Sequence, residues 1–133
     1  MKLGRILETV LYAEDLAAAE KFYIQVLGLD LVEKMEGRHL FFRYHSGMFL
    51  IFNPFATEKS PSELPLHGSH GIGHVAWAIS LDELPYWRET LNTSHVPIVK
   101  ETSWGNGSHS IYFHDPAGNS LEFATPSVWG MTE

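Results

Sequence analysis

The stretch IYFHDPAGNSLEF, residues 111–123, decides the fold of this chain. It predicts two strands joined by a tight turn, because Pro116 fixes φ and Gly118 or Asn119 can adopt a positive φ between them. Glu122 lies between two apolar residues of the second strand, which we expect to be central in a sheet. A carboxylate buried there costs several kcal/mol unless it is paired or binds a metal. The stretch therefore predicts a β-hairpin that carries a functional carboxylate.

The same order of elements occurs in both halves of the chain. The first half predicts strands over 6–13, 29–35, 39–44 and 48–53, and a helix that Asp15 caps and Gly28 ends. The second half predicts strands over 73–79, 96–101, 109–113 and 120–124, and a helix that Asp82 caps, with Pro85 in its first turn. We expect an α+β fold in which two βαβββ modules with pseudo-two-fold symmetry form one domain over residues 1–133. Module 1 spans about 5–54, a Pro-rich linker about 55–69, and module 2 about 70–126.

Aligning the two halves brings four equivalent positions together. Glu8 aligns with His74, and Ile51 aligns with Glu122. If the sheets pair around the pseudo-two-fold axis and curve into a cup, these four positions converge on a metal site. Glu8, His74 and Glu122 are good ligands for a divalent ion such as Fe(II), Mn(II), Ni(II) or Zn(II). Taken singly, Glu8 also fits a solvated edge carboxylate, and His74 fits a hydrogen-bonded structural histidine.

Strand alternation selects the residues that surround this site. His74 shares its strand face with small residues, which leave space for a ligand where a core would be filled. Tyr112 is the candidate catalytic residue, because its phenol could donate a hydrogen bond to an oxyanion; an amphipathic Tyr at the cup rim is the alternative. The candidate substrate-binding residues are Phe49, Ile51, Ala76, Trp104 and Ser110.

Composition and charge exclude several functions. Nine Lys and Arg against 16 Asp and Glu give a formal net charge of -7 without a basic cluster, which argues against nucleic acid as a partner. No apolar run approaches the roughly 18 residues that cross a bilayer, and the first residues lack the apolar segment of a secretory signal. We therefore expect a cytoplasmic protein that does not bind membranes. The chain has no cysteine, so any metal must be held by His and carboxylate groups.

Four segments together resemble the vicinal oxygen chelate superfamily, also called the glyoxalase/bleomycin resistance/dioxygenase fold. They are ETVLYAEDL (8–16), FYIQVLGL (22–29), GHVAW (73–77) and IYFHDPAGNSLEF (111–123). The resemblance implies paired βαβββ modules that form a cup, a homodimer, and a divalent metal that chelates vicinal oxygens of a small-molecule substrate. His74 and Glu122 match the family's ligand positions. Glu8 departs from the family's usual His, and Ile51 departs from the carboxylate or amide that glyoxalases have there.

These departures leave more than one function open. An apolar fourth position is similar to dioxygenases and to fosfomycin thiol transferases, but residues 102–108 hold no Lys or Arg to bind a phosphonate. We expect a metal-dependent enzyme acting on a small oxygen-rich molecule, and favour extradiol dioxygenase-like chemistry over glyoxalase-like or transferase chemistry. The alternative is a metal-free protein, similar to the bleomycin resistance proteins, that only sequesters a ligand.

Overall fold

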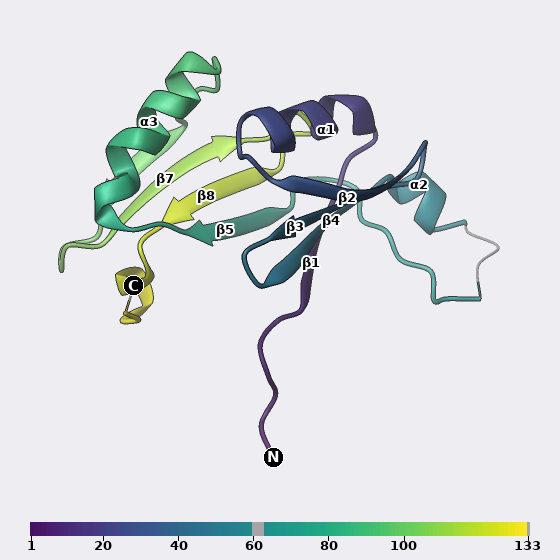
Figure 1. Ribbon diagram of the computed structural model, residues 1–133, viewed down its shortest axis with the longest axis horizontal. Helices are drawn as coiled ribbons and strands as arrows, with labels where there is room; N and C mark the ends of the chain where they lie inside the picture. The colour runs from purple at the N-terminus through teal and green to yellow at the C-terminus, as the bar shows by residue number, and fades with distance from the viewer. Residues whose placement is uncertain (60–62, 133) are drawn as a thin grey trace. The chain divides into compact units, whose positions relative to one another are not determined.

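A computed structural model describes residues 1–59 and 63–132. The chain divides into two compact units, Met1–Gly71 and Ile72–Glu133, and each contains one four-stranded sheet. Figure 1 shows the strands and helices of both units. No helix within the described ranges is long and apolar enough to span a bilayer.

Unit 1 has the predicted order of elements. It contains β1 (Glu8–Tyr12), α1 (Leu16–Gln25), β2 (Asp30–Met35), β3 (His39–Tyr44), β4 (Gly47–Phe52) and α2 (Pro54–Thr57). The strand order is β1-β4-β3-β2, and β1 pairs with β4 in parallel, as the crossover through α1 requires. Asp15 caps α1 by accepting a hydrogen bond from the Ala18 amide at 3.0 Å, as predicted.

Unit 2 repeats this topology. It contains β5 (His74–Ala78), a 3₁₀-helix η1 (Leu81–Glu83), α3 (Leu84–Thr93), β6 (Lys100–Ser103), β7 (His109–His114), β8 (Ser120–Ala124) and a second 3₁₀-helix η2 (Pro126–Trp129). The strand order is β5-β8-β7-β6, with β5 parallel to β8. The expected fold class, two βαβββ modules, is therefore confirmed.

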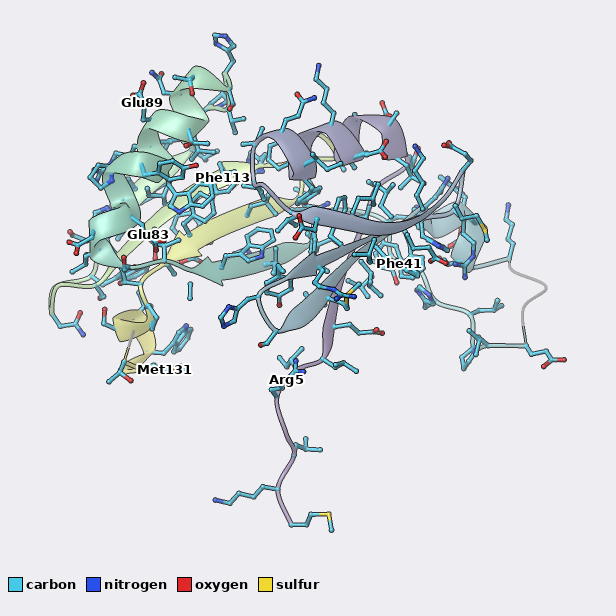
Figure 2. All side chains as sticks on the ribbon, viewed as in Figure 1. Arg5, Phe41, Glu83, Glu89, Phe113 and Met131 are labelled. Atoms are coloured by element: carbon cyan, nitrogen blue, oxygen red, sulfur yellow. The ribbon has the colours of Figure 1, made fainter. Side chains whose placement is uncertain are left out.

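One helix covers one face of each sheet. In unit 1, Tyr23 of α1 is fully buried, and its ring centroid lies 5.8 Å from that of Phe42 and 5.0 Å from that of Phe49. In unit 2, the ring of Trp87 on α3 lies 4.5 Å from that of Phe123. Phe113, labelled in Figure 2, belongs to the same helix-covered core. We call the other face of each sheet the pocket face.

The ladder registers correct the alignment of the two halves. In unit 1, Glu8 pairs with Met48, so the next position on the pocket face of β4 is Leu50. In unit 2, His74 pairs with Ser120, and the next such position is Glu122. The counterpart of Glu122 is therefore Leu50, and the prediction of Ile51 was wrong by one residue. In unit 1, Gly47 already belongs to β4, whereas in unit 2 Gly118 lies in the turn before β8, so aligning the last strands on these two glycines shifts the register by one residue.

Two other local predictions also change. The helical segment of the second half is capped two residues earlier than expected, because Ser80 and Glu83 form a capping box in which the Ser80 amide donates to Glu83 at 2.7 Å. Asp82 lies inside that first turn. The predicted linker begins with the short helix α2, which Asn53 caps through a hydrogen bond from the Phe55 amide.

Candidate functional site

His74 and Glu122 face each other on the pocket face of unit 2. The Nε2 atom of His74 lies 3.3 Å from Oε2 of Glu122. The imidazole is about half exposed and the carboxylate is only 12% exposed. The two side chains come from adjacent parallel strands, β5 and β8, in which Glu122 is the diagonal neighbour of His74. The expected convergence of these two residues is therefore observed.

The turn 115–119 holds β5 and β8 together at this point. Asn119 accepts a hydrogen bond from the Gly73 amide through Oδ1, and its amide group donates to Asp115 Oδ2, both at 2.9 Å. Asp115 Oδ1 in turn accepts the backbone amides of Ala117 and Asn119. Both side chains of this turn are buried. The sequence DPAGN therefore positions the residue immediately before His74.

A backbone carbonyl determines the protonation of the His74 ring. The Nδ1 atom lies 2.9 Å from the carbonyl oxygen of Ser120, which can only accept, so Nδ1 carries a proton. The Nε2 atom then has two possibilities: it carries a second proton that pairs with Glu122, or its lone pair points toward the carboxylate. In the second case two acceptors converge, an arrangement that a cation satisfies. A hydrogen bond from the second ring nitrogen to a carbonyl is the usual support of a metal-binding histidine.

Tyr112 lies directly beside Glu122, because the two residues are register partners in β7 and β8. Burial raises the pKa of the Tyr112 phenol, a hydrogen bond with Ser110 opposes this rise, and the neighbouring carboxylate of Glu122 adds to it. The phenol therefore keeps its proton at neutral pH and can act as a hydrogen-bond donor.

A pocket of about 460 Å³ adjoins these residues. Its lining includes Ala76, Trp104, Tyr112, Glu122, Ala124 and Trp129. Trp104 is half exposed, and its indole Nε1 donates to the Ser110 hydroxyl at 2.9 Å. Ser110 itself is fully buried, and it contacts both the indole and the Tyr112 phenol. The volume suits a small molecule.

Glu8 lies on the pocket face of unit 1, where it lines a second pocket. Across residues 1–59 and 63–132, no group of three or more His, Cys, Asp or Glu side chains is placed to hold a metal ion. The structure thus brings together two of the three predicted ligands, and Glu8 remains a prediction. An imidazole nitrogen and a carboxylate oxygen are donors that suit Fe(II), Mn(II), Ni(II) and Zn(II).

Two predicted substrate-binding residues belong to the core instead. Phe49 and Ile51 are fully buried, and they point to the face that α1 covers. A one-residue error in register exchanges the two faces of a strand, which explains the misplacement. Neither Leu50, which lines the pocket of unit 1, nor Trp129 of η2, which lines that of unit 2, was predicted from the sequence.

The fold and this face define a class of protein built from two βαβββ units, with a histidine and a carboxylate on adjacent parallel strands. The chain belongs to the Glyoxalase/Bleomycin resistance protein/Dioxygenase superfamily, whose family model matches residues 5–123. The resemblance seen in the sequence is therefore confirmed.

Named relatives extend this comparison. The chain is 32% identical over 116 residues to the metallothiol transferase FosB of Bacillus licheniformis, covering 86% of this chain and 71% of the relative. It is 23% identical over 146 residues to a lactoylglutathione lyase of Pseudomonas putida, covering 90% and 83% respectively. A solved lactoylglutathione lyase structure from Agrobacterium tumefaciens matches with a TM-score of 0.94 and 36% identity, over 98% of this chain and 100% of that chain.

Proposed function

We propose that this chain is a metal-dependent enzyme of the glyoxalase type, in which Glu8, His74 and Glu122 hold a divalent ion. The observation that carries the proposal is the approach of His74 Nε2 to Glu122 Oε2, with the opposite ring nitrogen bonded to a carbonyl. A bound Fe(II), Mn(II), Ni(II) or Zn(II) ion would polarise the oxygens of a small substrate and stabilise developing negative charge.

The residues around the pair have separate tasks in this proposal. Tyr112 donates a hydrogen bond to the substrate oxygen that gains charge, since its phenol stays protonated. The indole of Trp104 forms an apolar wall of the pocket, held by its hydrogen bond to Ser110. Ala76 has a small side chain at the register position opposite Glu122, which leaves room for the substrate.

Within this class we favour a reaction that uses a thiol. The names of two relatives, a metallothiol transferase and a lactoylglutathione lyase, support thiol chemistry over the dioxygenase chemistry that the sequence suggested. The fourth position of the set is Leu50, so the chain lacks a fourth ligand there. In this respect it is similar to fosfomycin thiol transferases as well as to dioxygenases. Two assays separate these reactions. Consumption of a thiol in the presence of an oxygen-rich electrophile would indicate thiol chemistry, and uptake of oxygen in the presence of a catechol would indicate dioxygenase chemistry.

Metal content tests the proposal directly. We expect about one transition-metal ion per chain in protein purified without an affinity tag, measured by mass spectrometry of the metals. The variant Glu122→Ala should lose the metal, whereas Glu89→Ala, which removes an exposed carboxylate of α3, should keep it. A native protein that contains no metal and takes none up on reconstitution would overturn the enzyme proposal and favour ligand sequestration.

The third proposed ligand, Glu8, connects the metal site to the oligomeric state of the protein. We propose a homodimer, in which Glu8 completes the site within its own chain or across to the partner. Mixing Glu8→Ala protein with Glu122→Ala protein distinguishes these cases, because only a site shared between chains regains metal binding in mixed dimers. A monomer in sedimentation would overturn the homodimer.

A further inference from the structure

The pocket of unit 1 contains a single arginine, at the end opposite Glu8. This pocket has a volume of about 450 Å³, and its lining includes Glu8, Arg38, Phe41, Leu50, Phe52 and His67. Most of this surface is apolar or aromatic, and the volume lies in the range of small-molecule sites. A lone cation in such a pocket is a candidate for ligand recognition.

A buried histidine fixes the position of Arg38. The Nη1 atom of Arg38 donates to Nδ1 of His39 at 2.6 Å, and Nε2 of His39 lies 2.8 Å from Oε2 of Glu33. Because a guanidinium only donates, Nδ1 of His39 is the acceptor and its Nε2 donates to Glu33. The His39 ring is buried and stacks on Phe41 with 3.9 Å between ring centroids. The guanidinium is thus held at one place on the sheet.

Among residues 1–59 and 63–132, no carboxylate pairs with the remaining donors of Arg38. None of the ion pairs formed by the described residues includes Arg38. Its guanidinium carbon lies 5.4 Å from the centroid of the Phe52 ring, a cation–π contact that leaves the edge of the guanidinium free. A guanidinium has five N–H donors, and its geometry matches the two oxygens of a carboxylate.

We propose that this pocket binds a small carboxylic acid with an apolar or aromatic body, and that Arg38 recognises its carboxylate. The apolar body lies over Phe41 and Leu50, which line the same pocket. The inference goes beyond the proposed metal chemistry, because it assigns a ligand class to Arg38, which is not one of the three proposed metal ligands. The pocket shares Glu8 with that proposed metal site.

Charge determines the direction in which such a ligand binds. Glu8 and Tyr12 are at opposite ends of β1. Tyr12 pairs with Phe52 of β4, and Phe52 pairs with His39 of β3, the residue next to Arg38. Arg38 is therefore near the Tyr12 end of the sheet. Four residues of extended strand span about 13 Å, so the two opposite charges are far apart along the pocket. A carboxylate is attracted to the Arg38 end and repelled from the Glu8 end, which orients the rest of the molecule toward Glu8.

Binding of 4-phenylbutyrate to the full chain tests the proposal. The protein is kept in a chelator, so the result does not depend on a metal, and amide NMR shifts report the affinity. We expect a dissociation constant of about 1 mM, with at least tenfold weaker binding of the uncharged analogue 4-phenylbutanol. Arg38→Gln should remove this preference for the acid. Arg38→Lys should keep part of the preference, since lysine retains the positive charge but lacks the paired N–H donors of the guanidinium.

Arg43→Gln is the matched control. It removes the same charge from an exposed residue of β3 that does not line the pocket, and it should leave the preference unchanged. The amide spectrum of each variant shows whether it is folded. Equal binding of the acid and the alcohol to the native protein would overturn the proposal. So would an equal loss in Arg43→Gln and Arg38→Gln, because it would mean that net charge, and not Arg38, selects the ligand. The two proposals can fail separately. If the purified protein contains no metal and takes none up, but still prefers the acid through Arg38, this site is supported and the metal proposal is not.

Discussion

Leu50 and Glu122 occupy equivalent positions in the two sheets. Leu50 pairs with Val10 of β1, and Glu122 pairs with Ala76 of β5, in ladders with the same parallel register. Both residues lie on the pocket face, where Glu122 is diagonal to His74 and Leu50 is diagonal to Glu8. A carboxylate in one unit therefore corresponds to a hydrocarbon in the other.

This equivalence predicts the effect of Leu50→Glu. The new carboxylate would be buried, since Leu50 is only 6% exposed, and it would lie diagonal to the like charge of Glu8. We expect a loss of about 3 kcal/mol in unfolding free energy. That loss corresponds to a melting temperature lower by roughly 10 °C. Because two facing carboxylates attract a divalent ion, Mn(II) or Zn(II) should restore part of the loss in calorimetry. Leu50→Gln should gain less from the ion than Leu50→Glu, since it keeps only the ligands of the native protein. Equal recovery of both variants would contradict the argument.

Tyr112→Phe removes the hydroxyl beside Glu122 and keeps the ring. If the phenol stabilises charge on the substrate, kcat should fall by roughly 100-fold, as for other single donors of this kind. Metal content and melting temperature should stay close to those of the native protein. Since burial raises the pKa of the Tyr112 phenol, ionisation of Tyr112 should not limit the rate near neutral pH. Undiminished kcat in Tyr112→Phe would remove Tyr112 from the catalytic set.

Asn119→Ala tests the turn that supports His74. The substitution removes the hydrogen bond that Asn119 donates to Asp115 and the one that it accepts from the Gly73 amide. Water cannot easily replace these bonds, because Asn119 is only 2% exposed. We expect urea unfolding to show a loss of about 2–3 kcal/mol. Metal affinity should also fall, because the β5 backbone next to His74 loses its support. The comparison is Asn92→Ala on the exposed surface of α3, which should change stability by less than about 0.5 kcal/mol. Similar losses in both variants would show that the turn has no special role.

Glu101 makes the stability of unit 2 depend on pH. Its hydrogen bond with Arg88 lowers the pKa of the carboxyl, with partial opposition from burial and a further lowering by His109. A carboxyl whose folded pKa is below its unfolded value stabilises the fold above the unfolded value of about 4.5, and this contribution is lost as the pH falls through the folded pKa.

Glu101→Gln should therefore show a smaller loss of stability between about pH 5 and pH 3 than the native protein, by at most about 1 kcal/mol. Urea unfolding at several pH values measures this difference. Glu89→Gln, which changes an exposed carboxylate of α3 (labelled in Figure 2), should follow the native curve. Parallel curves for the native protein and Glu101→Gln would contradict the prediction.

Local sequence signals predicted the fold well. The strands over 39–44 and 120–124 agree with β3 and β8, because alternation and flanking turn residues define a strand locally. The register between strands depends on partners distant in sequence, so aligning Gly47 with Gly118 was enough to misplace Ile51. The His74–Glu122 contact was predictable, since it follows from a parallel ladder between two recognisable strands. Arg38 gave no signal, because its importance comes from a buried histidine and a pocket that only the folded sheet creates.

The Asp115–Asn119 turn has a consequence for how this fold can change. One residue more or less at this hairpin would rotate every side chain of β8 to the opposite side of its sheet, and would move Glu122 into hydrocarbon. Substitutions around Arg38, by contrast, alter only the first unit's pocket. Insertions at the hairpin are thus expected to be eliminated by selection, while the arginine pocket can diverge from one descendant to the next and supply new ligand preferences.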